Sequence, residues 1–284
     1  MLTRMSALSE SLRLPDGPVD LARLPTDARP GFEGRKRDAV VAMVELGAEL
    51  ADLQERLHAD AYTGGSRRVL VVLQGMDTSG KGGVVNKAIG LLDPIGVRIT
   101  SFKKPTEEEL AHDFLWRIDR ALPGPGVVGV FDRSHYEDVL VPRVHAYADE
   151  AELDRRYDAI DAWERALVAG GTPVLKCFLH ISKQTQRERL LARLDDPLKR
   201  WKFKPGDIDE RAHWEAYQAA YTQALERCHT DVAPWHVVPS DTKWYRNWAV
   251  ATLLLELLRG MDLQWPEPDY DVEEQRARLL GEGA

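Results

Sequence analysis

Five short apolar runs, rich in β-branched residues, recur along the chain and predict buried strands. None alternates strictly between apolar and polar positions, as a strand with one solvent-exposed face would. A parallel sheet fits this pattern because its crossover helices cover both faces. The predicted strands are 69–73, 96–102, 127–131, 173–179 and 235–238.

Apolar residues with helical spacing lie before the first run and between the others. The clearest stretch is 33–59, in which four leucines share one face between charged residues. These are Leu46, Leu50, Leu53 and Leu57. Further helices are predicted at 82–92, 107–122, 150–168, 183–194, 208–228 and 243–258. The alternation predicts an α/β fold, with a doubly wound parallel five-stranded sheet and helices on both faces.

Composition narrows the class of protein. The 284 residues are 44% apolar and 30% charged, which is typical of a soluble globular protein. No apolar run approaches the roughly 20 residues of a membrane span, and residues 1–18 lack the continuous apolar stretch of a secretory signal. We therefore expect a cytoplasmic protein with no membrane partner. Its two cysteines, Cys177 and Cys228, fit reduced thiols better than a disulfide framework.

Charge bears on the choice of partner. The net charge of −8 argues against a nucleic-acid partner, because such proteins usually present a broad basic surface. Basic residues nevertheless gather in two stretches, Arg98 with Lys103 and Lys104, and then 187–204. A polyanion could therefore bind locally to this acidic protein.

The first predicted strand leads directly into a glycine-rich sequence, GMDTSGKGG at 75–83, and a helix follows it. The pattern G-x-x-x-x-G-K between a strand and a helix is typical of a P-loop, whose backbone N–H groups and helix N-terminus bind phosphate. We expect Gly80, Gly82 and Gly83 to let the backbone approach phosphate oxygens, and Lys81 to add a mobile cation. An ordinary glycine-rich turn is the alternative, and the position of the motif argues against it.

Gly82 occupies the position where P-loop NTPases place the Ser or Thr that binds Mg²⁺. Two carboxylates can replace that ligand, Asp77 within the loop and Asp132 at the end of the third predicted strand. Because open α/β sheets bind ligands at the carboxyl ends of their strands, both should meet there. We predict that Asp77 and Asp132 bind Mg²⁺, or Mn²⁺ in its place, although Asp132 could instead cap a helix or a turn.

Three segments resemble the polyphosphate kinase 2 family: LQGMDTSGKGG at 73–83, TSFKKP at 100–105 and FDRSHYEDVLV at 131–141. The resemblance spans about 35–260 and includes DPLKRWKF at 196–203, which is similar to the family's lid segment. It implies a P-loop, thymidylate-kinase-like fold and Mg²⁺-dependent transfer of phosphoryl groups between inorganic polyphosphate and nucleotides. It also implies a homo-oligomer, either a dimer or a tetramer.

With this resemblance we expect three parts of the chain. They are an N-terminal helical extension at 1–60, a P-loop kinase domain at 61–262 with a helical lid at about 183–210, and a peripheral C-terminal tail at 263–284. The sequence SHYED at 134–138 is similar to class III of the family, which accepts both nucleoside monophosphates and diphosphates. The expected reactions are AMP to ADP and ADP to ATP.

The resemblance also assigns catalytic roles. Lys81, Arg133 and Arg193 correspond to family positions that contact the reacting phosphates. Together with Asp77 and Asp132 they form the expected catalytic set. An isolated surface ion pair is the alternative for Arg133. We assign Asp77 to binding metal or orienting phosphate rather than to proton abstraction, because the terminal phosphate of a nucleotide is largely deprotonated at neutral pH.

Substrate binding is divided among the remaining candidates. For polyphosphate we expect Gly80, Lys81, Gly82 and Gly83 of the loop and Arg193, Lys199, Arg200 and Lys202 of the lid. For the nucleotide we expect Lys103, Lys104, Arg133 and Glu137. The sequence leaves open whether Lys103 and Lys104 bind polyphosphate instead. A solvated charged face is the alternative for the lid.

Three other functions fit parts of the sequence: an ADP-only polyphosphate kinase, an ATP-dependent nucleotide kinase, and a non-catalytic sensor of polyphosphate or nucleotide. The missing Ser or Thr after Lys81 argues against the ATP-dependent kinase. The intact set of Asp77, Lys81, Asp132 and Arg133 argues against the sensor. Adenine and guanine nucleotides remain equally open as substrates.

Overall fold

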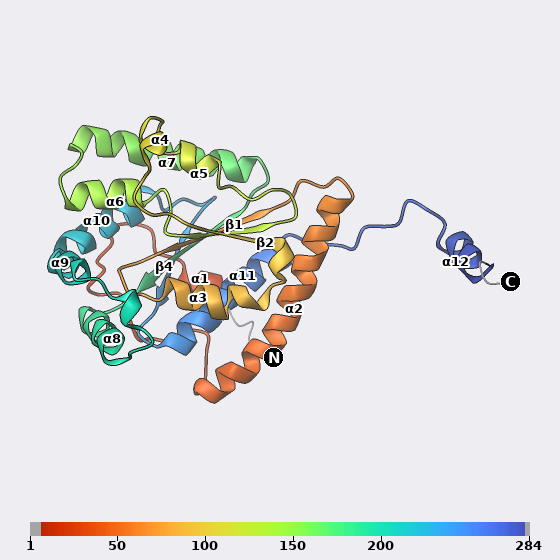
Figure 1. Ribbon diagram of the computed structural model, residues 1–284, viewed down its shortest axis with the longest axis horizontal. Coiled ribbons are helices and arrows are strands. Elements are labelled where there is room, and N and C mark those ends of the chain that lie inside the picture. The colour runs from red at the N-terminus through yellow and green to blue at the C-terminus, as the bar shows by residue number, and fades with distance from the viewer. Residues whose placement is uncertain (1–6, 282–284) are drawn as a thin grey trace.

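The computed structural model describes residues 7–281, and its centre is a five-stranded parallel sheet. The strand order is β2-β3-β1-β4-β5, and every neighbouring pair is parallel (Figure 1). The strands are β1 (Val69–Gln74), β2 (Val97–Ser101), β3 (Val128–Asp132), β4 (Val174–His180) and β5 (Trp235–Pro239). All five predicted strands are confirmed to within one residue at each end.

Helices cover both faces of the sheet, as predicted (Figure 1). Alternate residues of β1 belong to two separate apolar cores, Val69 and Val71 to the first and Leu70 and Val72 to the second. The first core is closed by α2 (Lys36–Tyr62), α3 (Lys81–Lys87) and α11 (Lys243–Gly260). The second is closed by α6 (Glu137–Val144), α7 (Glu150–Ala169) and α10 (Trp214–Arg227). A doubly wound α/β fold is therefore confirmed.

Three of the predicted helices are each divided. The predicted helix 82–92 consists of α3 and the 3₁₀ turn η1 (Ile89–Leu91). The predicted helix 107–122 consists of α4 (Glu107–Leu110) and α5 (Trp116–Asp119), because the Asp113 carboxylate accepts from the N–H of Leu115 (3.0 Å) and forms a turn. The predicted helix 208–228 consists of α9 (Gly206–Ala212) and α10, with a break at His213. There the N–H of His213 donates to Glu210 (3.1 Å), three residues back instead of four.

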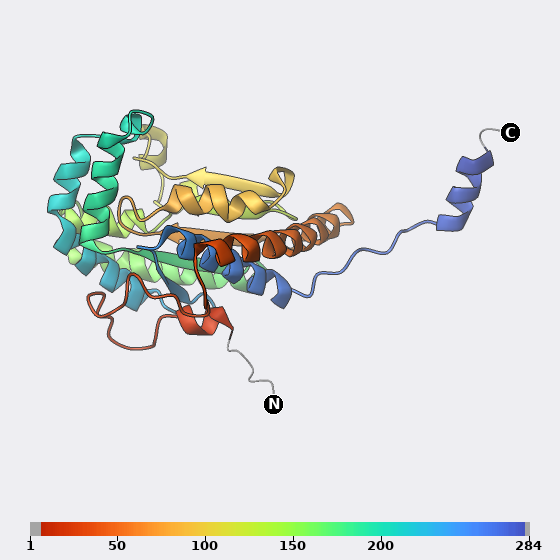
Figure 2. The same cartoon turned by 90° about the horizontal axis from the view of Figure 1, so that it is seen from below.

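Several short elements were not predicted. These are α1 (Leu8–Leu12), α6, α12 (Val272–Gly281) and the 3₁₀ turns η2 (Pro94–Gly96) and η3 (Arg200–Lys202). Residues 263–271 carry α12 away from the sheet, and no described side chain of α12 is buried (Figures 1 and 2). No helix within residues 7–281 has the length and hydropathy that a membrane crossing requires.

The segment 183–212 lies over the carboxyl ends of the strands, at one end of the molecule. It comprises α8 (Lys183–Asp195), η3 and α9, and Figure 2 shows its helices, in teal, at the end towards which β2 points. Ser182 caps α8 by accepting from the N–H of Thr185 (3.0 Å). The fold thus sets this segment opposite the loop between β1 and α3.

Candidate active site

The loop between β1 and α3 has an unusual backbone. Gly75 (φ 146°), Thr78 (φ 62°) and Gly80 (φ 108°) all lie in the left-handed region. A Cβ on Gly75 would come within 2.6 Å of the Leu179 carbonyl, so only glycine fits there. The loop lies at the carboxyl end of β1, where the sequence places the P-loop.

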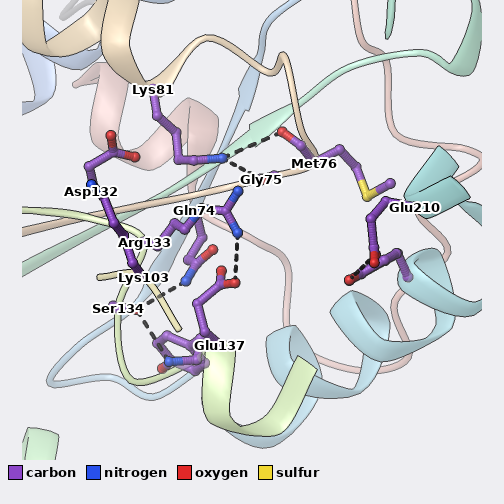
Figure 3. A network of polar contacts seen from close by, with 12 residues as sticks. Gln74, Gly75, Met76, Lys81, Lys103, Asp132, Arg133, Ser134, Glu137 and Glu210 are labelled. Atoms are coloured by element: carbon purple, nitrogen blue, oxygen red, sulfur yellow. Dashed lines mark hydrogen bonds and ion pairs between the residues drawn. The ribbon is translucent and has the colours of Figure 1, made fainter. Parts of the chain in front are cut away.

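Lys81 opens α3 and is almost completely buried. Its ammonium donates to the carbonyl oxygens of Gly75 (2.8 Å) and Met76 (3.5 Å), as Figure 3 shows. Burial lowers the pKa of Lys81 to about 8, and Arg133 acts in the same direction, while Asp132, Glu137 and Asp77 oppose both. Three carboxylates and the Arg133 guanidinium therefore lie close enough to Lys81 to influence its charge.

The turn after β3 presents Arg133 beside the loop. Arg133 has a left-handed backbone (φ 66°), a conformation that costs about 1–3 kcal/mol when adopted by a residue with a side chain. Its guanidinium donates to the Glu137 carboxylate (3.0 Å), and Glu137 raises the pKa of Arg133 (Figure 3). With its amide nitrogen towards Glu137, Gln74 donates to Oε1 (3.2 Å) and accepts from the Ser134 hydroxyl (3.1 Å). The end of β1 thus fixes the turn after β3.

Arg193 is the predicted lid cation that contacts a carboxylate of the loop. It lies in the last turn of α8, and its Nη1 contacts Asp77 Oδ2 (3.3 Å) and Asp207 Oδ2 (3.4 Å). The other lid candidates stay on the lid. Lys199 pairs with Asp196 (2.5 Å), Arg200 donates to the Leu194 carbonyl (2.8 Å) and Lys202 lies over the Trp201 ring (5.0 Å).

Lys103 and Lys104 lie exposed on the segment that follows β2. Asp132 is close to this segment, because β2 and β3 are paired and Ser101 donates to Asp132 Oδ2 (3.3 Å). Neither lysine forms an ion pair among residues 7–281. Both lysines are therefore free to contact a substrate beside Asp132.

A cavity of about 220 Å³ opens beside the loop. It separates the P-loop and the turn after β3 from α9 and α10, and its wall combines aromatic, apolar and charged side chains. Its lining includes Met76, Asp77, Arg133, Glu137, Leu140, Asp207, Glu210, Tyr217 and Tyr221. Tyr217 donates to Glu210 (2.8 Å), which fixes the ring at the edge of the cavity.

Asp77 and Asp132 fit a magnesium ion held partly by substrate. Within residues 7–281 no three or more Asp, Glu, His or Cys side chains gather as a metal site. Mg²⁺ in phosphoryl-transfer enzymes needs only one or two carboxylates, with phosphates and waters completing its octahedron. Two buried hydroxyls of the loop, on Thr78 and Ser79, also lack a hydrogen-bond partner among the described residues. Such groups suit a loop that binds a phosphate with its metal.

Similarity to known proteins agrees with this geometry. The family described as polyphosphate kinase 2 (PPK2) matches residues 34–266. The chain belongs to the polyphosphate kinase 2 family. It is 46% identical over 255 residues to an AMP/ADP-polyphosphate phosphotransferase of Meiothermus ruber, covering 90% of this chain and 94% of that protein. It is 36% identical to an ADP-polyphosphate phosphotransferase of Rhodopseudomonas palustris, covering 93% and 94%.

A solved member of the polyphosphate kinase 2 family has the same fold. The crystal structure of polyphosphate kinase 2 from Arthrobacter aurescens TC1 superimposes with a TM-score of 0.95 at 49% sequence identity, covering 98% of each chain. The P-loop kinase-like architecture expected from the sequence is therefore confirmed by a similar structure.

Sequence reasoning missed several residues that shape the site of this polyphosphate kinase 2 family member. Gln74 and Ser134 brace the turn after β3, and both were overlooked as ordinary polar neighbours of a motif. Lys176 offered a clearer signal, because a charged residue inside the apolar run 173–179 requires a buried partner. That partner is Glu164 of α7 (2.5 Å), and both side chains are fully buried.

Proposed function

We propose that the protein transfers phosphoryl groups between inorganic polyphosphate and nucleotides, converting AMP to ADP and ADP to ATP. The observation that carries the proposal is the convergence of Lys81, Arg133 and Arg193 at a P-loop that also lines a cavity. Two phosphate substrates repel each other, so cations must gather where they meet. The name of the Meiothermus ruber relative supports the same pair of acceptors.

Polyphosphate is assigned to the loop and the lid. Gly80, Gly82 and Gly83 allow the backbone to approach its oxygens, and Lys81 turns from the loop carbonyls to its phosphates. Arg193 lies across from the loop and contacts Asp77, so a phosphate chain between α3 and α8 would meet cations on both sides. The exposed Lys199, Arg200 and Lys202 extend this charge along the lid.

The nucleotide is assigned to the cavity. Its aromatic and apolar wall suits a base and ribose, while Arg133 and Glu137 lie where the cavity meets the loop. AMP and ADP differ in length by one phosphate. The long, flexible side chains of Lys103 and Lys104 can reach the terminal phosphate of either nucleotide. A pocket of this kind accepts both AMP and ADP, and the choice between adenine and guanine stays open.

Asp77 and Asp132 would hold Mg²⁺, or Mn²⁺, between the substrates. The metal would neutralise charge on the phosphate oxygens when bound. The chain's own residues position the reaction: Arg133 is fixed by Glu137, and Arg193 by Asp77 and Asp207. We further propose a cytoplasmic homo-oligomer, a dimer or tetramer, whose mass light scattering would report.

Parallel reactions with different donors test the proposal. The purified protein with Mg²⁺ and either AMP or ADP receives polyphosphate, ATP or no donor, and the nucleotides are separated after incubation. We expect phosphorylation of AMP with polyphosphate and none without a donor. Phosphorylation with ATP alone would instead indicate an ATP-dependent kinase. Polyphosphate-dependent conversion of ADP but not AMP would restrict the protein to ADP.

A further inference from the structure

Two guanidinium groups lie against the outer side of the P-loop. Arg246 of α11 is 4% exposed, and its Nη1 donates to the Ser79 carbonyl (3.0 Å). Arg189 of α8 donates through Nη1 to the carbonyls of Thr78 (2.7 Å) and Ser79 (3.0 Å). Its Nη2 donates to the carbonyls of Ser240 (2.5 Å) and Asp241 (3.0 Å). Two helices that are distant in sequence thus hold the Ser79 carbonyl together, and Arg189 of α8 also holds the Thr78 carbonyl.

Neither guanidinium forms an ion pair with a carboxylate anywhere in residues 7–281. Besides Ser79, Arg246 contacts the neutral side-chain oxygen of Asn247 (2.8 Å). Burial, and then Arg189, lower the pKa of Arg246 to about 9. A buried cation without a counter-charge is costly to a folded protein. A multiply charged anion bound in the loop would supply the missing negative charge.

Two glycines, Gly80 and Gly83, leave the space that the Arg246 side chain occupies. A Cβ on Gly80 would lie 1.7 Å from its Nη1, and a Cβ on Gly83 would lie 2.5 Å from its Nη2. A Cβ on Gly82, by contrast, would meet no atom within 4 Å. Gly80 and Gly83 therefore leave room for an arginine behind the loop, in addition to any phosphate in front of it.

Peptide geometry shows what these contacts do. The described chain has no cis peptide, so each C=O points away from the N–H of the next residue. Holding the Thr78 carbonyl outwards turns the N–H of Ser79 inwards, where it donates to Met76 (3.0 Å). Holding the Ser79 carbonyl outwards turns the N–H of Gly80 inwards in the same way. The arginines thus fix the turn that Ser79 closes with Met76, and they orient the N–H of Gly80.

We propose that Arg246, assisted by Arg189, is a positioning residue for polyphosphate: it holds the P-loop with its N–H groups inwards and adds positive charge behind the bound chain. The inference rests on the proposed function, since it names the substrate whose binding the arginines prepare. Arg246 itself does not touch the substrate. It acts through the loop, so its loss should affect polyphosphate binding more than nucleotide binding.

The test replaces Arg246 with Met, which keeps the length of the side chain and removes the charge and the donors. Arg259→Met is the matched control, because Arg259 lies on the same helix and pairs with Glu49 at the surface (2.6 Å). Two quantities are measured for each variant: the KM for polyphosphate and for ADP, and the rise in Tm caused by inorganic tripolyphosphate alone.

We expect Arg246→Met to raise the KM for polyphosphate by roughly tenfold or more, as the loss of charge-assisted hydrogen bonds does, and the KM for ADP less than about twofold. Tripolyphosphate should no longer raise its Tm. Arg246→Lys keeps the charge but loses the planar guanidinium with its several N–H donors. Its KM for polyphosphate should therefore lie between those of the wild type and Arg246→Met. If Arg246→Met does not fold, this lysine variant decides the question.

A purely structural role predicts a different result. Arg246→Met, or Arg246→Lys in its place, would then lower the Tm yet keep the wild-type KM for polyphosphate and the wild-type response to tripolyphosphate. That outcome overturns the inference and leaves the proposed function intact. A wild-type protein that neither responds to tripolyphosphate nor transfers from polyphosphate would refute the proposed function itself.

Discussion

Lys81 is a buried lysine whose pKa the fold lowers. Its ammonium is nearly removed from water and contacts only backbone carbonyls, so burial lowers its pKa to about 8. A lysine in water titrates near pH 10.4, so the fold brings this cation close to the physiological range. Negative phosphates would favour the charged form.

The shifted pKa of Lys81 predicts that activity declines in mild alkali. Below about pH 8 the free enzyme carries the cation, and above it the cation is lost, so kcat/KM for polyphosphate should fall as pH rises through about 8. The free energy of unfolding should instead rise with pH between about pH 8 and 10.4. In this range the unfolded chain still binds the proton of Lys81, whereas the folded chain has released it. Steady-state rates across this range check the prediction, and a flat profile to about pH 9.5 contradicts it.

Asp132 is the residue that tests the metal assignment. It ends β3, and one oxygen accepts from Ser101 (3.3 Å). A neutral amide is a poorer ligand for a hard cation than a carboxylate, so Asp132→Asn should raise the Mg²⁺ concentration for half-maximal rate by roughly tenfold. A magnesium titration measures it, with Asp161→Asn on the outer face of α7 as control. An unchanged titration would remove Asp132 from the metal site.

At the scale of elements, the turn from β3 into α6 depends on a buried ion pair beneath it. Lys176 of β4 contacts Glu164 (2.5 Å) and the hydroxyl of Tyr136 (3.1 Å), and Tyr136 donates to Glu164 (2.7 Å). Burial alone would raise the pKa of Glu164, but Lys176 and His135 hold it below its usual value. The turn that carries Arg133 is therefore anchored from within the core.

Breaking this pair should destabilise the protein strongly. Lys176→Met leaves Glu164 buried without its cation, and the loss of one member of a buried pair costs about 3–5 kcal/mol. The double variant Lys176→Met, Glu164→Gln should recover part of that loss, because no buried charge remains. Urea unfolding gives both values. Equal stability of wild type and Lys176→Met would show that the pair does not anchor the turn.

The elements differ in how far the sequence predicts them. Continuous apolar runs identify β1, β3, β4 and β5 because both faces of these strands are buried. The position of β2 was also predicted, but the expectation that it is buried was wrong, because β2 is an edge strand with no fully buried residue. Helix breaks at Asp113 and His213 were missed, since each depends on a local hydrogen bond that leaves the apolar spacing unchanged. The eight-residue α6 was also missed, because it contains Pro142 and is too short to show a clear period.

At the scale of the molecule, the site joins segments that are far apart in the sequence. The P-loop could be predicted because its residues are consecutive, and Arg193 followed from family resemblance. Arg246 could not, since it lies 165 positions beyond Lys81 and reaches the loop only because α11 packs beside α3. The strand order also depends on long-range pairing, which apolar periodicity does not encode.

The architecture as a whole implies two successive transfers at one site. The loop and lid face each other across the path assigned to polyphosphate, and the cavity for the nucleotide opens beside them. If the terminal phosphate of either acceptor reaches the same in-line position, as we propose, AMP should become ADP and then ATP. A time course with AMP as the sole nucleotide, polyphosphate and Mg²⁺, free of adenylate kinase, tests this claim most directly. We predict that ADP rises first and falls as ATP appears, and that Lys81→Ala, although folded, forms neither; a wild-type reaction that yields no ADP would contradict the account.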